Sequence, residues 1–285
     1  MNLKLEKLPD SLPLSLKALG SLRRKPPEQL VLPELTVEIP SFRFDAANLQ
    51  AYRKICGFPE EGAVPIPYPQ VSAIGLQMFL LTQPQFPLPL LGLVHLRNRI
   101  TQERELAADE TFAVHVAVGE SRSTGKGLEF DIDTRYSDAQ GRAVWTATAS
   151  VLFRRKAGTD GVKKSAVPDD GAGLAAYHSL EAPADIGRRY GRIAGDNNPI
   201  HLYPLTAKLF GFPKPIAHGM WSLSRSCALL QPGLPRPPRE LTVKFIQPLF
   251  LPGRATLRYG EQADGIAFKL IGRDGDKAHL SGTLR

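Results

Sequence analysis

Residues 190–207 (YGRIAGDNNPIHLYPLTA) gather an acid, two amides, a proline and a histidine within a short stretch. Asp196 and His201 are five positions apart, and Asn198 and Pro199 lie between them. Proline has no N–H and disfavours the helical conformation in the residue before it, so this spacing predicts a turn that carries Asp196. A carboxylate and an imidazole that meet on such a turn can hold one water molecule and pass protons in both directions.

Two other interpretations of the same residues stay open. Asp-Asn-Asn-Pro is also a common composition for ordinary turns and helix caps, in which a nearby histidine is only polar surface. Asp196, His201 and His218 could also be the three protein ligands of a catalytic zinc ion. However, His218 precedes a predicted helix and no two histidines have helical spacing, so we expect no metal.

The segment resembles the signature of the (R)-specific enoyl-CoA hydratases, also called hydratase 2 or MaoC-like dehydratases. That signature places a tyrosine, an aliphatic residue, Gly-Asp, Asn-Pro, a second aliphatic residue, a histidine and a small residue at fixed spacing. The matching residues are Tyr190, Ile193, Gly195, Asp196, Asn198, Pro199, Ile200, His201 and Ala207. Ala194 departs from the pattern, which has Ser, Thr, Gly or Cys there, and this removes a hydroxyl group but no reacting group.

The resemblance implies a catalytic role for Asp196 and His201, which would share the water. It also implies that the backbone N–H of Gly219, at the start of a central helix, stabilises the thioester oxygen as charge develops there. Asn198 would support the site, either by positioning the water or by holding the turn. The residues expected at the substrate are Tyr190, Gly195, Pro199 and His218. No cofactor is implied, because coenzyme A arrives as part of the substrate.

A weaker copy of this pattern lies in the first half of the chain, at a constant offset of 138 residues (190 − 52). The equivalent pairs are Tyr52 with Tyr190, Ile55 with Ile193, and Gly57 with Gly195. Further along, Gly75 parallels Gly219 at an offset of 144 (219 − 75), and an apolar run follows each glycine. Alternating apolar residues later in both halves predict strands, so each half is expected to be one long buried helix followed by antiparallel strands.

The resemblance implies the same α+β architecture. It predicts two hot-dog domains in tandem, a double hot dog, in which each antiparallel sheet wraps around a long central helix. We expect an N-terminal arm over residues 1–35, without sustained periodicity and laid over the body, and a first domain over 36–156. A linker over 157–176 is rich in Gly, Ala, Asp and Lys, and the second, catalytic domain covers 177–285.

The two halves differ where the chemistry would occur. Phe58, Ala63 and Ile74 occupy the first-half positions equivalent to Asp196, His201 and His218. This asymmetry predicts one reacting half and one supporting half. The resemblance also implies that the altered first half accommodates the acyl chain, and we assign that role to Pro65–Leu93. Its dense prolines are expected to leave irregular extended chain, although they could simply cap loops.

Composition and charge narrow the class of protein. The 285 residues, 42% of them hydrophobic, can bury the cores of two domains. Cys56 and Cys227 form no disulfide framework and have no metal-type spacing, which suggests a reducing compartment. No signal core and no apolar run of membrane-spanning length is present, so we expect a cytoplasmic protein without a membrane span.

The net charge of +8 suits an anionic ligand. The basic clusters are scattered and have few aromatic neighbours, which argues against nucleic acid, whereas the phosphates of coenzyme A would match the same charge. The sequence contains neither a serine-hydrolase elbow nor a phosphate-binding glycine loop.

We therefore expect a hydro-lyase that adds water to trans-2-enoyl-CoA to give (R)-3-hydroxyacyl-CoA, or catalyses the reverse reaction. One alternative is a dehydratase of acyl-carrier-protein thioesters or of short, branched or dicarboxylic acyl-CoA. Another is a non-catalytic subunit that binds acyl thioesters. A homodimer is compatible with either function, although two hot dogs in one chain already supply the pairing that single-domain relatives obtain by dimerising.

Overall fold

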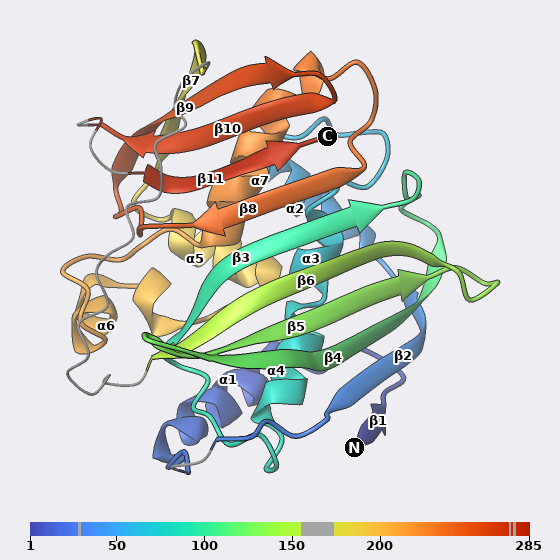
Figure 1. Cartoon of the computed structure of the whole chain (residues 1–285), viewed down its shortest axis with the longest axis vertical. Coiled ribbons are helices and arrows are strands. Elements are labelled where there is room, and N and C mark those ends of the chain that lie inside the picture. The colour runs from blue at the N-terminus through green and yellow to red at the C-terminus, as the bar shows by residue number, and fades with distance from the viewer. Residues whose placement is uncertain (28–29, 155–173, 274, 276–277) are drawn as a thin grey trace.

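The computed structural model describes residues 1–27, 30–154, 174–273, 275 and 278–285. These residues form a layer of strands with the main helices packed on one face (Figure 1). No helix among them is long and apolar enough to cross a membrane.

The first half of the chain forms the lower part of the molecule in Figure 1. Its strands are β1 (Asn2–Lys4), β2 (Thr36–Arg43), β3 (Leu93–Gln102), β4 (Thr111–Thr124), β5 (Gly127–Ser137) and β6 (Ala143–Arg154). Its helices are α1 (Ser11–Gly20), the 3-10 turn η1 (Ser21–Arg23), α2 (Ala46–Cys56), α3 (Tyr68–Ser72) and α4 (Ile74–Thr82). The buried helix α4 contacts β2 and β4, so the sheet of this half wraps around it.

The second half repeats this order of elements in the upper part of the figure. Its strands are β7 (Ala176–Ala182), β8 (Glu240–Phe245), β9 (Gly253–Gln262), β10 (Gly265–Gly272) and β11 (Ala278–Leu284). Its helices are α5 (Ile186–Ala194), η2 (Pro199–His201), α6 (Pro204–Leu209), α7 (Gly219–Leu230) and η3 (Gln231–Gly233). The apolar helix α7 is almost entirely buried and is the central helix of this half.

Within the described residues the strands form a single sheet whose two halves mirror each other. The short strand β1 forms the edge of the first half; inward from it the order is β2-β4-β5-β6-β3, and from the other edge inward the second half has β7-β9-β10-β11-β8. These orders correspond strand for strand, and β3 and β8 meet as antiparallel neighbours in the middle (Figure 1). The internal repeat and the double hot-dog fold are therefore confirmed.

The repeat is also visible at the ends of α2 and α5. Each helix stops at a glycine in the left-handed conformation, with φ of 78° at Gly57 and 71° at Gly195. Glycine adopts this conformation without a steric penalty and so terminates a helix at low cost. The two helices contact each other, and the Asn48 side-chain amide of α2 donates to the Ile193 carbonyl of α5 at 2.9 Å.

The expectation of irregular chain over segment 65–93 is right for residues 83–92, which contain Pro84, Pro87 and Pro89, and wrong for the residues that form α3 and α4. Helix α3 begins beside Pro67 and carries Pro69 in its first turn. A first-turn N–H has no partner within the helix, so its absence costs little there. The prolines act instead at the other end, because α4 stops at Thr82 shortly before Pro84.

The predicted arm contains regular structure. Strand β1 pairs in parallel with β2, and α1 packs against α4 with Leu14 and Ala18 buried. The predicted linker over 157–176 lies mostly outside the described residues, and β7 begins at Ala176.

One guanidinium holds the C-terminal end of α4. Arg24 donates hydrogen bonds of 2.8–2.9 Å to four backbone carbonyls, those of Leu81, Thr82, Gln83 and Leu88. The last carbonyls of a helix have no N–H partner within the helix, so a donor from elsewhere can bind them. A cation at this end is also favoured by the helix dipole. Arg24 therefore ties the N-terminal segment to the central helix of the first half.

We predict that Arg24→Met lowers the free energy of unfolding by about 2–3 kcal/mol, because it removes several charge-assisted hydrogen bonds at once. Urea denaturation measures the effect. The neighbouring Arg23 is exposed and provides a matched control, so Arg23→Met is expected to change stability by less than about 0.5 kcal/mol. Equal effects of the two substitutions would contradict this role for Arg24.

Candidate active site

The loop after α5 carries the acid and the first histidine. Its turn is built by local hydrogen bonds, because the Asp196 carboxylate accepts from the Asn198 N–H at 3.1 Å and the Asn198 side chain accepts from the Ile200 N–H at 3.4 Å. Pro199 then starts η2, whose last residue is His201. The expected turn is therefore present and brings Asp196 and His201 to the same region.

The face of α5 beneath this loop has two glycines where side chains would block it. A β-carbon on Gly187 would lie 2.0 Å from the carbonyl oxygen of His201. A β-carbon on Gly191 would lie 2.7 Å from the carbonyl oxygen of Asp196. Such distances are sterically forbidden, so only glycine at these positions lets the loop lie directly on the helix.

The segment before α7 holds His201 from the other side. The Nδ1 atom of His201 lies 2.8 Å from the Ile216 carbonyl oxygen, and the Ile216 N–H donates to the Ile200 carbonyl at 3.1 Å. A carbonyl can only accept, so Nδ1 carries the proton and Nε2 has a free lone pair. His201 is thus fixed as a proton acceptor at Nε2.

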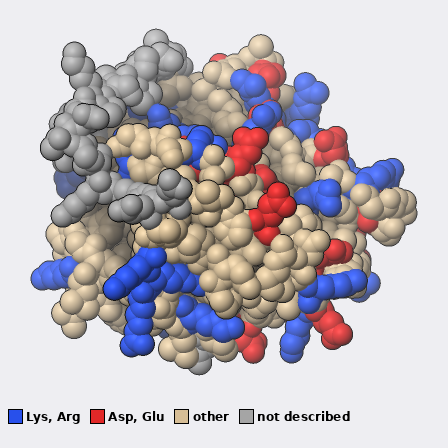
Figure 2. Space-filling model, turned by 60° about the horizontal axis from the view of Figure 1, so that its bottom comes forward, with Lys and Arg blue, Asp and Glu red and all other residues tan. Residues whose placement is uncertain are grey.

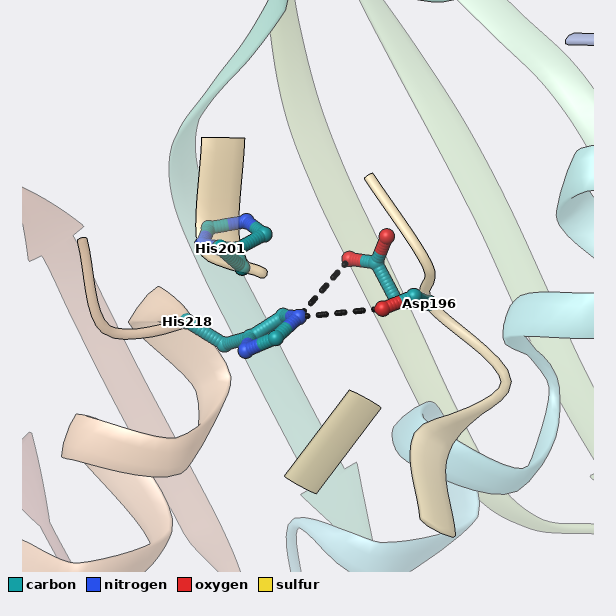
Figure 3. Close-up of side chains that lie close together, drawn as sticks. All are labelled: Asp196, His201 and His218. Atoms are coloured by element: carbon teal, nitrogen blue, oxygen red, sulfur yellow. Dashed lines mark hydrogen bonds and ion pairs between the residues drawn. The ribbon is translucent and has the colours of Figure 1, made fainter. Parts of the chain in front are cut away.

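His218 is the residue that caps α7 and lies beside Asp196 (Figure 3). Its Nε2 atom is 3.1 Å from the Asp196 carbonyl oxygen and 3.8 Å from the carboxylate oxygen Oδ2. The Nδ1 atom of His218 is buried and has no hydrogen-bond partner among the described residues. His218 therefore donates through Nε2 and helps to hold Asp196 in place.

The two imidazoles stack on each other, with ring centroids 3.7 Å apart and an angle of 26° between the planes. Burial lowers the pKa of His201, although the Asp196 charge opposes this effect. Burial, together with the neighbouring His201, lowers the pKa of His218 to about 3. Both rings are therefore neutral near pH 7.

One donor atom from each of Asp196, His201 and His218 lies within 4.8 Å of the other two. Figure 3 shows the three side chains converging from different elements. The Asp196 side chain is 31% exposed, whereas that of His218 is 4% exposed, so the acid is the accessible member. These are residue types that can hold a metal ion, and each of the two histidines already has one ring nitrogen within hydrogen-bond distance of a backbone carbonyl.

Gly219 is the first residue of α7, and its N–H has no acceptor within the helix. A β-carbon on Gly219 would lie 2.9 Å from the ring of Phe245, the last residue of β8. Glycine is therefore required here to let this aromatic ring approach the N-terminus of the helix. The Phe245 ring therefore lies against the start of α7, where the Gly219 N–H has no acceptor within the helix.

The remaining predicted residues, Tyr190, Gly195, Pro199 and Asn198, shape α5 and the turn that follows it. Tyr190 is 1% exposed and lies behind His218, with ring centroids 5.1 Å apart. Gly195 ends α5, Pro199 starts η2, and Asn198 caps that turn. A contact between any of these residues and the substrate stays a prediction.

At the positions equivalent to Asp196, His201 and His218 the first half has no polar side chain. Phe58 is buried and stacks on Tyr52, with centroids 5.9 Å apart. Arg53 stands where α5 has Gly191, by the offset of 138 (191 − 53). Its guanidinium donates to four carbonyls of the loop that follows α2: Pro59, Glu61, Gly62 and Ala63.

Sequence reasoning missed four residues of the site region: Gly187, Gly191, Phe245 and His95 of β3, whose ring lies 4.8 Å from that of Phe245 between centroids. The two glycines had a signal, since glycines at i and i+4 of a helix indicate close approach by another segment. Phe245 and His95 had none, because only the sheet brings β8 and β3 to the start of α7.

Comparison with known proteins adds an independent finding. Residues 173–278 match the family described as MaoC like domain. The chain is 33% identical over 260 residues to 3-hydroxyacyl-thioester dehydratase X of Mycobacterium tuberculosis, covering 89% of this chain and 90% of that protein. The crystal structure of HtdX of Mycobacterium tuberculosis superposes with a TM-score of 0.75 at 30% identity, covering 88% of this chain and 99% of that one. Peroxisomal enoyl-CoA hydratase 2 of Arabidopsis thaliana is 27% identical over 146 residues, which is 46% of each chain.

We predict that the free energy of unfolding falls as the pH drops from about 6.5 towards 4. The histidines with lowered pKa values bind protons more readily in the unfolded chain, so acid favours unfolding. Each such group contributes up to about 1.4 kcal/mol per pH unit. Urea denaturation at several pH values measures the slope. His218→Phe should flatten it by about one proton, and an unchanged slope in this variant would contradict a neutral, buried His218.

Proposed function

Because the chain belongs to the MaoC-like hydratase/dehydratase family, we propose that its Asp196–His201 pair adds water to the double bond of a trans-2-enoyl thioester and removes it in reverse. The protein is a hydro-lyase that acts on acyl thioesters. The (R) configuration of the 3-hydroxyacyl product is the part of this proposal that rests on the signature Tyr190–Ala207 alone.

The observation that supports this reaction best is the short distance between the Asp196 carboxylate and the His201 ring. A water molecule that donates to two acceptors holds them about 4.5 Å apart. One carboxylate oxygen of Asp196 and one ring nitrogen of each histidine lie within 4.8 Å of one another, so a water molecule beside Asp196 is within reach of the His201 ring. The Asp196 carboxylate and the His201 Nε2 lone pair can each accept one hydrogen bond from this water.

In the hydration direction, His201 Nε2 takes one proton from the water as its oxygen bonds to C3 of the enoyl group. The resulting imidazolium is stabilised by the Ile216 carbonyl at Nδ1 and by the nearby Asp196 carboxylate. The same Nε2–H then protonates C2 of the enolate, which completes the addition of one water. Dehydration follows these steps in reverse, so the His201 imidazole ends each cycle neutral.

The thioester oxygen becomes negative while C2 is an enolate. The free N–H of Gly219 at the start of α7 is suited to donate to this oxygen, since a helix N-terminus also carries a partial positive charge. One such donor typically contributes about 3 kcal/mol in the transition state. His218 holds Asp196 through its hydrogen bond to the Asp196 carbonyl, and Tyr190 packs against the His218 ring. Neither residue exchanges protons with the substrate in this mechanism.

We propose coenzyme A as the carrier of the acyl group, with an acyl-carrier protein as the alternative. The net charge of +8 favours the phosphates of coenzyme A. On the face shown in Figure 2, basic side chains are interspersed with acidic ones and form no continuous stripe of the kind that nucleic acid needs.

The segment Pro65–Leu93, which contains α3 and α4, is proposed to accommodate the acyl chain, since the first half has apolar residues in place of the reacting groups. A cytoplasmic location and a homodimer are further expectations.

We predict that Asp196→Asn and His201→Ala each lower kcat for hydration of crotonyl-CoA by about 10²–10⁴-fold, since each removes a proton acceptor from the shared water. Loss of the enoyl-thioester absorbance measures the rate. Asp185→Asn and His178→Ala are matched controls, because Asp185 precedes α5 and pairs with Arg189, and the His178 ring on β7 stacks on Tyr259. Both controls should keep wild-type rates.

Activity that survives both Asp196→Asn and His201→Ala would place the reaction elsewhere in the molecule. A folded wild type that hydrates neither crotonyl-CoA nor a longer enoyl-CoA would favour a dehydratase of carrier-protein thioesters or a non-catalytic binding subunit.

The convergence of Asp196, His201 and His218 supports metal-assisted hydration as the second candidate mechanism. Our proposal needs no metal, so dialysis against a strong chelator is expected to leave kcat and KM for crotonyl-CoA unchanged. Loss of activity that is restored by adding Zn²⁺ would favour the metal mechanism instead.

A further inference from the structure

His95 is a histidine of the first half that lies on the core face of the sheet. It belongs to β3, where an irregularity in the pairing with β6 separates His95 from Arg97. His95 lies opposite Val151 and Arg97 opposite Ser150, so Leu96 is an extra residue in the ladder. Such a bulge changes which residues share a face. It places His95 on the same side as the core residue Val151 and directs Arg97 outward to Glu129.

One ring contact places His95 beside the start of α7. Its ring packs against the Phe245 ring at a centroid distance of 4.8 Å, and Phe245 in turn covers Gly219. The Asp196 carboxylate also acts on His95 electrostatically and raises its pKa, although burial has the larger effect and lowers the pKa to about 4. His95 is therefore a neutral imidazole near the groups assigned to water and to the thioester oxygen.

One nitrogen of His95 is free to bind a ligand. A neutral imidazole carries its proton on one nitrogen only, and with that proton on Nδ1 the Nε2 atom can accept a hydrogen bond. The other nitrogen, Nε2, is buried and has no partner among the described residues. A buried acceptor without a partner is unfavourable, so a hydrogen-bond donor on a bound substrate would be stabilised at His95 Nε2.

The shared water cannot be that partner. A water molecule can donate two hydrogen bonds, and in the proposed mechanism the Asp196 carboxylate and His201 Nε2 accept both of them. The partner considered for His95 is therefore a group of the thioester substrate itself. Among the groups close to a thioester carbonyl, the donor common to coenzyme A and carrier-protein substrates is the amide N–H of the pantetheine arm nearest the sulfur.

We propose that His95 Nε2 accepts a hydrogen bond from this amide N–H and so positions the thioester carbonyl at the Gly219 N–H. The inference rests on the proposed function. Sulfur and two methylene groups separate the carbonyl from the amide, and the Phe245 ring separates Gly219 from His95. The apolar link can thus lie on the ring while its two polar ends meet one partner each. His95 is a positioning residue contributed by the half that lacks the reacting groups.

The test compares two small crotonyl thioesters that differ only in the amide. One is the thioester of N-acetylcysteamine, which keeps the N–H, and the other is that of 2-mercaptoethyl acetate, in which an ester oxygen replaces it. We expect wild type to prefer the amide by about tenfold or more in kcat/KM, because the ester leaves Nε2 facing another lone pair. His95→Ala should abolish this preference, and His95→Gln, whose amide oxygen can still accept, should restore part of it.

His115→Ala is the matched control, because it removes a histidine from the outward face of β4 in the same half. This variant should keep the wild-type preference for the amide. Equal use of both thioesters by wild type, an undiminished preference in His95→Ala, or a wild-type kcat/KM of His95→Ala on crotonyl-CoA would each overturn the proposal. These outcomes differ from failure of the proposed function, in which wild type does not hydrate crotonyl-CoA at all.

Discussion

The close approach between α5 and the loop after it is the constraint on which the site depends. Gly187 and Gly191 let the carbonyl groups of His201 and Asp196 lie where a β-carbon would otherwise stand. On its other side the loop is tied to Ile216, which accepts the Nδ1–H of His201 and donates to Ile200. Because both supports are backbone groups, the tautomer and the direction of the His201 ring are set before any substrate binds.

The first half shows what the same frame becomes without that constraint. At the position equivalent to Gly191 it has Arg53, whose guanidinium fills the space and binds four loop carbonyls. The loop after α2 is thus tied to its helix through a long side chain, and the buried Phe58 stands where the second half has Asp196. In the second half the loop instead lies directly on the two glycines of α5.

The electrostatics of the site follow from its burial. His201 and His218 stack at 3.7 Å, and each is costly to protonate because burial removes the water that would solvate the charge. Asp196 is the more exposed member and the group beside which a transient imidazolium can form at the lowest cost. A neutral histidine that gains a proton only during the reaction is well suited to transferring it onward.

The sequence alone determined the fold and singled out Asp196 and His201 as the candidate pair, because both leave local signals: the signature around Asp196 and His201, and the Tyr-Ile-Gly pattern that recurs 138 residues earlier (190 − 52). It misjudged the prolines before α4, since a first helical turn tolerates proline and only the three-dimensional boundary shows where that turn begins. The tertiary structure alone decided that His95 and Phe245 reach the start of α7. Strand pairing between β3 and β8 joins residues from opposite halves, and a single bulged residue sets which face His95 occupies, so neither relation is written in local spacing.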